Sequence, residues 1–525
     1  MAARRTFLVL LICLVALDVV VLVIRVRDAI GPGGPLFLFP AEGPVVYALW
    51  RLQHGYPLYE LPTEPVYTLT EYNVFFYRAY ALLLRMAGAT DGGIPVASRL
   101  IAMGFAAVGS IVQFAVTRRL FSSARPPAHL LALVAFVTWF GCALPGWWTF
   151  AIRPDIPAAV CALIGLAAAA EGFGRRPGRG FLLVGASVSF LCAWMFKQSA
   201  IALFAGTVVY ALVWRRSVRE LVLLAAPFLA GALVMLAALG PAYRANLIQA
   251  PALNAWLPHL PLHWFRSIFL IELMPWALAL YAIATLLRPL LSSPSLATVD
   301  GIGSRSESAF HLDLTYPVVA TVVAFCCVSV LLSKEGSALN HALELQVSAS
   351  LVACGVLAGA WTAARRRLWW AAALALVPML AFDAALLAGA ERGRMATWLQ
   401  LKVWGDTLHL ASAGEIEDRR NLAARFASLP TPVYCEDEVL SLPWHSTGNT
   451  YPAVIIDHIF YDAAVRQGLI SGGVDRLFRD RYFGAAVLRD ESPFIPVAVR
   501  AGYRLRGSVF PSSSPGQALR LLVRE

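Results

Sequence analysis

Apolar segments of helix length recur along most of the chain, and they constrain its fold more than any other feature. A helix needs about 20 apolar residues to cross the hydrocarbon core of a bilayer. The candidate segments are 6–24, 72–88, 96–117, 128–145, 156–172, 180–196, 198–214, 219–240, 264–288, 313–333, 340–362 and 368–388. Hydrophobic residues make up 59% of the chain and charged residues only 14%, which excludes an ordinary soluble protein. We therefore expect an all-α polytopic membrane core with about 11–12 transmembrane helices.

Basic residues near the ends of these segments predict how the chain is oriented, because Lys and Arg concentrate on the cytoplasmic side of a membrane. The Arg residues concerned lie at 4–5, 118–125, 175–179, 215–219, 288 and 365–367. They predict a cytoplasmic N-terminus, a first extracytoplasmic loop at 25–71 and an extracytoplasmic C-terminal region. No small-residue cleavage site follows the first segment, so we expect that segment to remain as an anchor.

This orientation requires that one apolar segment does not span, since the C-terminus would otherwise return to the cytoplasm. We expect 72–88 to be that segment, because it is short and contains Arg78 and Arg85. The net charge of +11 then belongs mainly to cytoplasmic loops that face anionic lipid. Membrane lipids are therefore expected partners, and nucleic acid is not.

The composition changes after residue 388. Alternating stretches at 431–435, 453–457 and 485–489 are typical of strands, and helical patterns lie near 417–428 and 473–480. A region of about 135 residues is long enough for a small domain. The sequence thus predicts a membrane core over 1–388 and a small extracytoplasmic α/β domain over 389–525.

The first extracytoplasmic loop contains Glu42, followed by Gly43-Pro44 and an amphipathic stretch at 45–54. A helix over 45–54 would lie in the membrane interface. At the start of that helix, the carboxylate of Glu42 suits a general base or a metal ligand. It also suits a simple helix cap, since acids are favoured at helix N-termini.

Three further polar clusters fall on the same predicted side of the membrane. They are Arg153-Pro-Asp155, Lys197-Gln-Ser199, and the run from Lys334 to His341 that leads into Glu344. Random placement would divide such clusters between the two sides. Their grouping therefore indicates a polar chamber that faces one aqueous compartment.

Each cluster also has a purely structural interpretation. Arg153 and Asp155 can pair with each other while Asp155 caps a helix. Lys197 is costly inside an apolar stretch and needs an anionic partner, which is either a phosphate or a carboxylate. His341 and Glu344 lie three residues apart on one helix face, which suits a metal, a sugar hydroxyl or an unliganded helix entrance.

Short loop motifs give the chain a family resemblance. They read Glu42-Gly-Pro-Val-Val-Tyr-Ala48, Gly55-Tyr-Pro-Leu-Tyr59, Tyr72-Asn-Val-Phe-Phe-Tyr77, Arg153-Pro-Asp155, Phe196-Lys-Gln198 and Ser337-Ala-Leu-Asn-His341. They resemble the motifs of bacterial GT-C glycosyltransferases, the polyprenyl-phosphate-sugar-dependent enzymes related to protein O-mannosyltransferases and aminoarabinose transferases. The resemblance covers about 1–365, and the region that follows resembles the variable C-terminal domain of such proteins.

The resemblance implies a GT-C-like fold in the bacterial inner (plasma) membrane. It also implies transfer of a sugar from a polyprenyl-phosphate-linked donor to an extracytoplasmic acceptor, which is a lipid, a glycan or a protein. The implied mechanism is inverting: a carboxylate, here Glu42, deprotonates the acceptor hydroxyl as it attacks the anomeric carbon. Lys197 and Arg153 would bind the donor phosphate and stabilise the leaving group.

Other residues of the matching motifs and loops are expected to bind substrate. They are Tyr59, Tyr72, Asn73, Asp155, Gln198, Asn340, His341 and Glu344. Any divalent cation, Mg²⁺ or Mn²⁺, would assist the donor phosphate, but the sequence does not require one. No residue is assigned to that cation, and the sequence has no zinc-type spacing of Cys and His.

The first loop departs from the family pattern at one position. Many relatives have Asp-Glu where this chain has Ala41-Glu42, and that Asp is the expected catalytic base. Three interpretations stay open: Glu42 takes over as base, another acid of the loop does so, or catalysis has been lost. The Pro-Pro-Leu-like helix entrance of relatives is also replaced, by Asn73-Val-Phe75.

The alternative function is that of a transporter or a non-catalytic lipid- or glycan-binding protein with the same chamber. Transporters often contain paired structural repeats, and no convincing repeat is visible in the sequence. A large domain outside the membrane also suits an enzyme with an external acceptor. The sequence therefore favours the glycosyltransferase.

Overall fold

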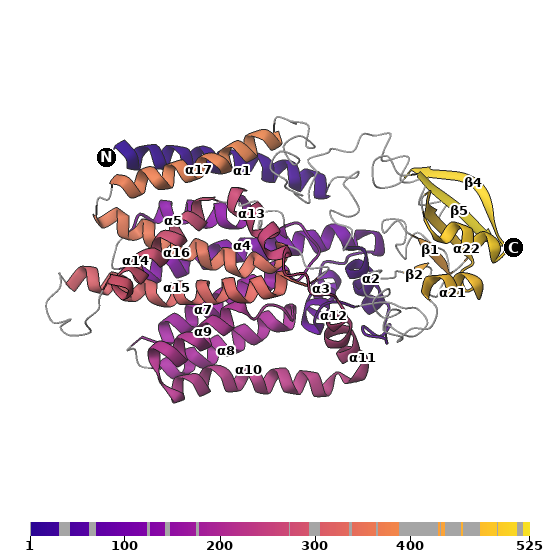
Figure 1. The fold of residues 1–525 in the computed structure, drawn as a ribbon, viewed down its shortest axis with the longest axis horizontal. Helices are drawn as coiled ribbons and strands as arrows, with labels where there is room; N and C mark the ends of the chain where they lie inside the picture. The colour runs from indigo at the N-terminus through magenta and orange to yellow at the C-terminus, as the bar shows by residue number, and fades with distance from the viewer. Residues whose placement is uncertain are drawn as a thin grey trace.

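The computed structural model describes most of the membrane region and parts of the C-terminal region. The described residues are 2–30, 42–61, 70–122, 126–141, 148–174, 178–271, 273–292, 305–334, 339–363, 366–387, 429–430, 432–435, 453–454, 473–490, 492–511 and 518–525. Within them, long helices run side by side to form a bundle, and a smaller unit of strands and helices lies beyond one end of it (Figure 1).

Eight helices among the described residues are long and apolar enough to cross a membrane. They lie in α1 (Ala2–Ile30), α4 (Ile94–Leu120), α7 (Asp155–Gly172), α8 (Arg179–Phe196), α10 (Val218–Ala238), α15 (Arg305–Leu332), α16 (Leu343–Ala363) and α17 (Arg366–Leu387). Shorter apolar helices involve α5 (Ala128–Phe136), α9 (Ala202–Tyr210) and α14 (Leu273–Ser292). The predicted all-α polytopic membrane core is confirmed.

The segment that was expected not to span forms a short helix. α3 (Val74–Met86) has 13 residues, which gives a length of about 20 Å against a hydrocarbon core of about 30 Å. The single span predicted at 264–288 corresponds to α13 (Leu260–Ile271) and α14, and residue 272 lies outside the described residues.

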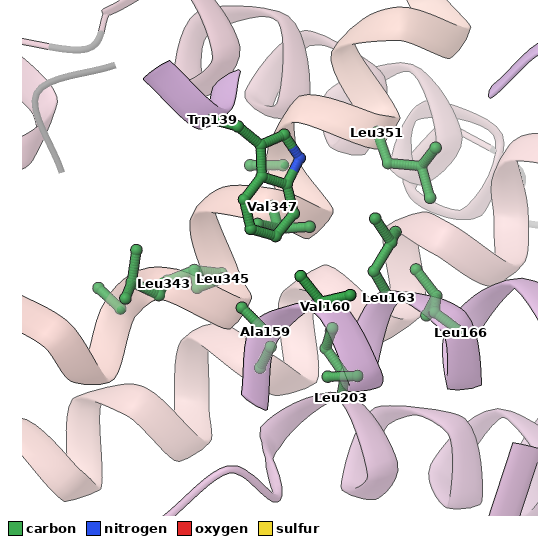
Figure 2. Close-up of a cluster of buried hydrophobic side chains, with 14 of the residues drawn as sticks. Trp139, Ala159, Val160, Leu163, Leu166, Leu203, Leu343, Leu345, Val347 and Leu351 are labelled. Carbon is green, nitrogen blue, oxygen red and sulfur yellow. The ribbon is translucent and has the colours of Figure 1, made fainter. Parts of the chain in front are cut away.

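α16 is the central helix of the bundle. In the 18-residue apolar stretch within Asn340–Trp361, 94% of the residues are buried inside the protein. Figure 2 shows its Leu343, Leu345, Val347 and Leu351 side chains beside residues of α7, Leu203 of α9, and Trp139. A helix that is apolar on all sides suits such a position, because other helices surround it. The polar residues at the N-terminal end of α16 are therefore surrounded by other helices.

Small residues allow neighbouring helices to approach closely. A Cβ atom added at Gly206 in α9 would lie 2.7 Å from the Cα of Ala320 in α15. A Cβ atom added at Gly165 in α7 would lie 2.9 Å from the ring of Phe190 in α8. Since lipid tails are as apolar as Leu side chains, such close van der Waals contacts stabilise a bundle inside a membrane.

The C-terminal region contains a five-stranded mixed sheet. Its strands are β1 (Val433–Cys435), β2 (Ala453–Val454), β3 (Ala485–Arg489), β4 (Tyr503–Pro511) and β5 (Ala518–Arg524), in the order β2-β1-β3-β5-β4. β1 is parallel to β2 and to β3, whereas β5 is antiparallel to β3 and to β4. Helices α21 (Gly473–Arg479) and α22 (Phe494–Arg500) accompany the sheet.

The predicted α/β character of this region is confirmed, with differences in detail. Strands form within 431–435, 453–457 and 485–489, and α21 lies at the helix expected near 473–480. The helix expected at 417–428 and the predicted domain boundary after residue 388 lie outside the described residues. The sequence analysis missed α22, β4 and β5, although β4 and β5 complete the antiparallel half of the sheet.

A short segment of the membrane region contacts the sheet domain. α11 (Gly240–Arg244) and α12 (Ala250–Ala252) lie at the end of the bundle nearest the sheet (Figure 1). Ala250 is buried in the same apolar cluster as Tyr434 and Phe478 of the sheet domain, and Leu253 packs against that cluster. This contact fixes the domain beside the end of the bundle.

Candidate functional site

Three helix ends meet at a buried group of charged and polar residues. Asp155 begins α7, Lys197 follows the last residue of α8, and Asn340 lies in the short helix η6 (Leu339–Ala342) that precedes α16. The ammonium group of Lys197 forms an ion pair with Oδ1 of Asp155. The amide of Asn340 donates to the same oxygen at 2.9 Å. Lys197 and Asp155 are both buried.

The position of Lys197 follows from a break between two helices. Its backbone is extended, with φ −141° and ψ 116°, so α8 ends there and α9 begins at Ala202. The polar run Lys197-Gln-Ser199 interrupts the apolar pattern at this point. The break lets Lys197 reach the N-terminus of α7 instead of facing lipid.

Arg153 adds a second cation to the group. Its Nε lies 3.3 Å from Oδ2 of Asp155, and its Nη2 donates to the hydroxyl of Tyr72. The guanidinium also lies over the rings of Tyr72 and Trp148, at 5.2 and 5.1 Å from the ring centres, which is cation–π geometry. Burial lowers the pKa of Arg153, but Tyr72 and Asp155 raise it by more, so the net pKa lies above its ordinary value.

Tyr72 is buried, and burial raises the pKa of its phenol well above the ordinary value. Its hydroxyl therefore stays protonated, and it accepts from Arg153 while keeping a proton to donate. Tyr59 supports this residue, because its hydroxyl donates to the backbone carbonyl of Tyr72 at 2.7 Å. The structure thus brings Tyr72 into the charged group and places Tyr59 behind it.

Asn73 is fully buried and forms hydrogen bonds within the protein. Its Oδ1 accepts from the N–H of Val74 at 3.1 Å, as a cap of α3, and from the hydroxyl of Tyr243 at 2.5 Å. Its amide donates to the carbonyl of Trp194 at 2.9 Å. These bonds hold α3 against α8 and α11, which is a positioning role; contact of Asn73 with substrate stays a prediction.

The remaining residues expected to bind substrate surround Lys197. Gln198 donates from its amide to the carbonyl of Glu71 at 2.6 Å. Glu344 accepts the N–H of Leu203 with its Oε2 at 3.1 Å, at the N-terminus of α9. His341 is half-buried beside Asn340 in η6. The residues predicted in separate motifs are therefore gathered at one place.

Glu42 differs from these residues because its side chain is closed off. It begins α2 (Glu42–Gln53) and is fully buried. Its Oε1 accepts the N–H of Ile152 at 2.8 Å, and its Oε2 pairs with Arg99 of α4 at 3.2 Å. Both carboxylate oxygens are therefore engaged in contacts within the protein. The role of Glu42 as general base stays a prediction, and it requires one of these two contacts to open.

Several residues that shape the site were not predicted from the sequence. Arg99 could have been predicted, because the sequence shows a cation inside an apolar segment and such a residue needs a partner. In the structure Arg99 is buried. Tyr243 and Asn246 give no comparable signal. Asn246 accepts the N–H of Thr70 at 2.7 Å and donates to the carbonyl of Glu60 at 2.7 Å, so it binds two parts of the first loop.

The charged group of the site does not have the composition of a metal centre. Within the part of the chain that the structure describes, no three His, Cys, Asp or Glu side chains come close enough together to hold a metal ion. The carboxylate of Asp155 faces Lys197 and Arg153 instead. The involvement of Mg²⁺ or Mn²⁺ stays a prediction.

Comparisons with known proteins give a match at the level of the fold. No protein-family model and no curated protein matches the chain. The crystal structure of ArnT from Cupriavidus metallidurans bound to undecaprenyl phosphate is similar over 97% of both chains, with 14% identity and a TM-score of 0.55. The apo state of the same protein is similar over 97% of both chains, with 16% identity and a TM-score of 0.53. The chain therefore has an ArnT-like polytopic membrane fold, as the GT-C resemblance implies.

Proposed function

We propose that this membrane protein is a glycosyltransferase that moves a sugar from a polyprenyl-phosphate-linked donor to an acceptor outside the cytoplasm. The observation that carries the proposal is the pair of cations at the meeting point of three helix ends, the buried Lys197 and the half-buried Arg153. The ArnT-like fold supports it, because ArnT was crystallised with undecaprenyl phosphate.

The two cations suit the phosphate of such a donor. A buried ammonium or guanidinium group needs an anion nearby, and among the described residues one carboxylate, that of Asp155, forms ion pairs with both Lys197 and Arg153. A phosphate placed against them would add a second anion. The hydroxyl of Tyr72, which accepts from Arg153, still has a proton to donate to a phosphate oxygen.

The same residues favour departure of the polyprenyl phosphate. When the bond between the anomeric carbon and the phosphate oxygen breaks, the phosphate gains negative charge. Cations and hydrogen-bond donors fixed in advance stabilise that charge most at the moment it develops. Lys197 and Arg153 are fixed by Asp155, and Tyr72 is fixed by Arg153.

In the proposed inverting step, the acceptor hydroxyl attacks the anomeric carbon from the side opposite the phosphate, and a carboxylate takes its proton. Glu42 is the acid that the sequence favours for this role. Glu71 is the rival: it is half-buried, it precedes Tyr72, and its negative charge acts on Arg153. Comparison of variants at both positions would assign the base.

The test combines a purified protein with a deletion strain. Protein in lipid nanodiscs is mixed with labelled polyprenyl-phosphate sugars and envelope extract, and glycosylated product is measured. Mass spectrometry of envelope glycans and lipids then compares the deletion strain with wild type. A missing sugar modification in the strain and product formation in vitro support the enzyme. Binding of polyprenyl phosphate without any transfer, in an unchanged envelope, would support the non-catalytic lipid-binding alternative instead.

A further inference from the structure

Three buried oxygen atoms near Lys197 have no hydrogen-bond partner among the described residues. They are Oε1 of Gln198, Oδ1 of Asn340 and Oε1 of Glu344, which we call the acceptor cluster. Asn340 and Glu344 are more than nine-tenths buried. Because buried polar atoms in proteins almost always form hydrogen bonds, these atoms are suited to a ligand that supplies donors.

Chemistry fixes which atom of each amide is left over. The NH₂ group of Asn340 donates to a carboxylate oxygen of Asp155 at 2.9 Å. The NH₂ group of Gln198 donates to the backbone carbonyl of Glu71 at 2.6 Å. Both partners are acceptors, so neither amide can be turned around without losing its bond. The free atom is therefore the carbonyl oxygen in both cases.

Glu344 also presents an acceptor. Its Oε2 takes the N–H of Leu203 at 3.1 Å, at the N-terminus of α9. Its second oxygen, Oε1, is buried and has no hydrogen-bond partner among the described residues.

The site then has two chemically different sides. Lys197 and Arg153 provide positive charge, which suits the phosphate of the donor. The acceptor cluster provides two amide carbonyl oxygens and one carboxyl oxygen, which suit hydroxyl or amine groups. Asn340 joins the two sides, since its side-chain NH₂ group donates to Asp155 at 2.9 Å and its backbone carbonyl accepts from Lys197 at 3.5 Å. A ligand that fills both sides has an anionic group next to a group rich in hydrogen-bond donors.

We infer that the acceptor cluster selects the sugar of the donor, an inference that rests on the function proposed above. The sugar presents hydroxyl or amine donors to Gln198, Asn340 and Glu344, and it has no carboxylate at that place. A uronic acid would set its carboxylate against the side-chain carbonyl oxygens of Gln198 and Asn340, with repulsion in place of hydrogen bonds.

The test compares four lipids that have the same undecaprenyl chain. The three that contain a sugar have the same glucose-type ring. The four lipids are undecaprenyl phosphate alone and its glucosyl, glucosaminyl and glucuronyl derivatives, each bound to the full-length protein in nanodiscs. The glucosyl or the glucosaminyl lipid is expected to bind at least about tenfold more tightly than the bare phosphate, and the glucuronyl lipid no more tightly. Tighter binding of the glucosyl lipid would identify a hydroxyl as the hydrogen-bond donor, and tighter binding of the glucosaminyl lipid would identify an amine. A glucuronyl lipid that binds as tightly as the best of them overturns the inference.

Glu344→Gln is a matched variant, because Gln keeps an oxygen for the N–H of Leu203 and turns the second oxygen into a donor. It is expected to remove most of the gain from the sugar while binding of bare undecaprenyl phosphate persists. Glu171→Gln is the control, since Glu171 pairs with Arg119 near the other end of α7. A gain that survives Glu344→Gln overturns the inference.

The outcome also separates this inference from the proposed function. If wild-type protein binds bare undecaprenyl phosphate but gains nothing from any sugar, the selection of sugar by the acceptor cluster is wrong and the phosphate site stands. If no polyprenyl phosphate binds at all, the proposed function itself fails. If Glu344→Gln does not fold, the comparison of the four lipids with wild-type protein decides the inference alone.

Discussion

Oε1 of Glu42 accepts a hydrogen bond from the backbone N–H of Ile152 at 2.8 Å, although 110 residues separate the two in the sequence. Ile152 directly precedes Arg153, whose guanidinium reaches Asp155 and Tyr72. The first loop and the start of α7 therefore form one unit. A change at Glu42 is expected to move the cations of the site as well as any proton that Glu42 accepts.

We predict that Glu42→Gln lowers both transfer and stability. Gln can still accept the N–H of Ile152, but it leaves the buried guanidinium of Arg99 without its carboxylate. Removal of one partner of a buried ion pair typically costs about 3–5 kcal/mol, and loss of a general base costs about 10²-fold or more in rate. Thermal unfolding in detergent and a transfer assay measure the two effects.

Two further variants separate these roles. Arg99→Met in the Glu42→Gln background removes the buried charge that has lost the carboxylate of Glu42, and it is expected to restore part of the stability but not the transfer. Glu71→Gln tests the rival acid. Normal transfer by Glu42→Gln, together with no transfer by Glu71→Gln, would assign the base to Glu71.

We predict that Asn73→Ala destabilises the protein more than Tyr243→Phe. The Ala variant loses the bonds of Asn73 to Val74, Trp194 and Tyr243, whereas the Phe variant loses one of them. At about 1 kcal/mol for each hydrogen bond, the difference is roughly 2 kcal/mol, visible as a lower Tm. Tyr243→Phe is expected to bind undecaprenyl phosphate normally. Equal stability of Asn73→Ala and wild type would contradict the positioning role of Asn73.

The sequence predicted those parts of the molecule that depend on local composition. Apolar length located the spanning helices, and the polar content and shortness of 72–88 identified α3. Lys197 was predicted from the cost of buried charge and Arg153 from its motif with Asp155, and the structure places both at Asp155. What the sequence does not contain is pairing between distant residues. Neither the bond of Glu42 to Ile152 nor that of Asn73 to Tyr243 has any local pattern.

We predict that the N-terminus is cytoplasmic and that the region after 388 lies outside, because the Arg clusters near the spans are one-sided. Reporter fusions after Arg367 and after Glu525 test the two sides of α17, the last helix of the membrane core. Arg367 lies at the start of α17, and Glu525 lies beyond its end. A phosphatase reporter is expected to be inactive at Arg367 and active at Glu525. The opposite result would invert the whole orientation and place the candidate site in the cytoplasm.

The last prediction concerns Lys197, which we expect to bind the donor phosphate. Lys197→Met preserves side-chain length and apolar contact but removes the charge that Asp155 now pairs with. The affinity for undecaprenyl phosphate in nanodiscs is expected to fall by about tenfold or more, since a hydrogen bond between charged groups contributes roughly 1.5–3 kcal/mol. Arg153 still pairs with Asp155 in this variant, so the fold is expected to survive.

A second substitution separates phosphate binding from a purely structural ion pair. In the double variant Lys197→Met with Asp155→Asn, no buried carboxylate is left without its ammonium partner, so any instability that arises from the broken pair should be relieved. If Lys197 binds phosphate, the double variant stays stable and its affinity stays low, because the cation is still missing. If Lys197 serves only Asp155, the single variant loses folded protein and the double variant recovers both folding and normal affinity. That second result would remove one of the two cations on which the proposed function rests.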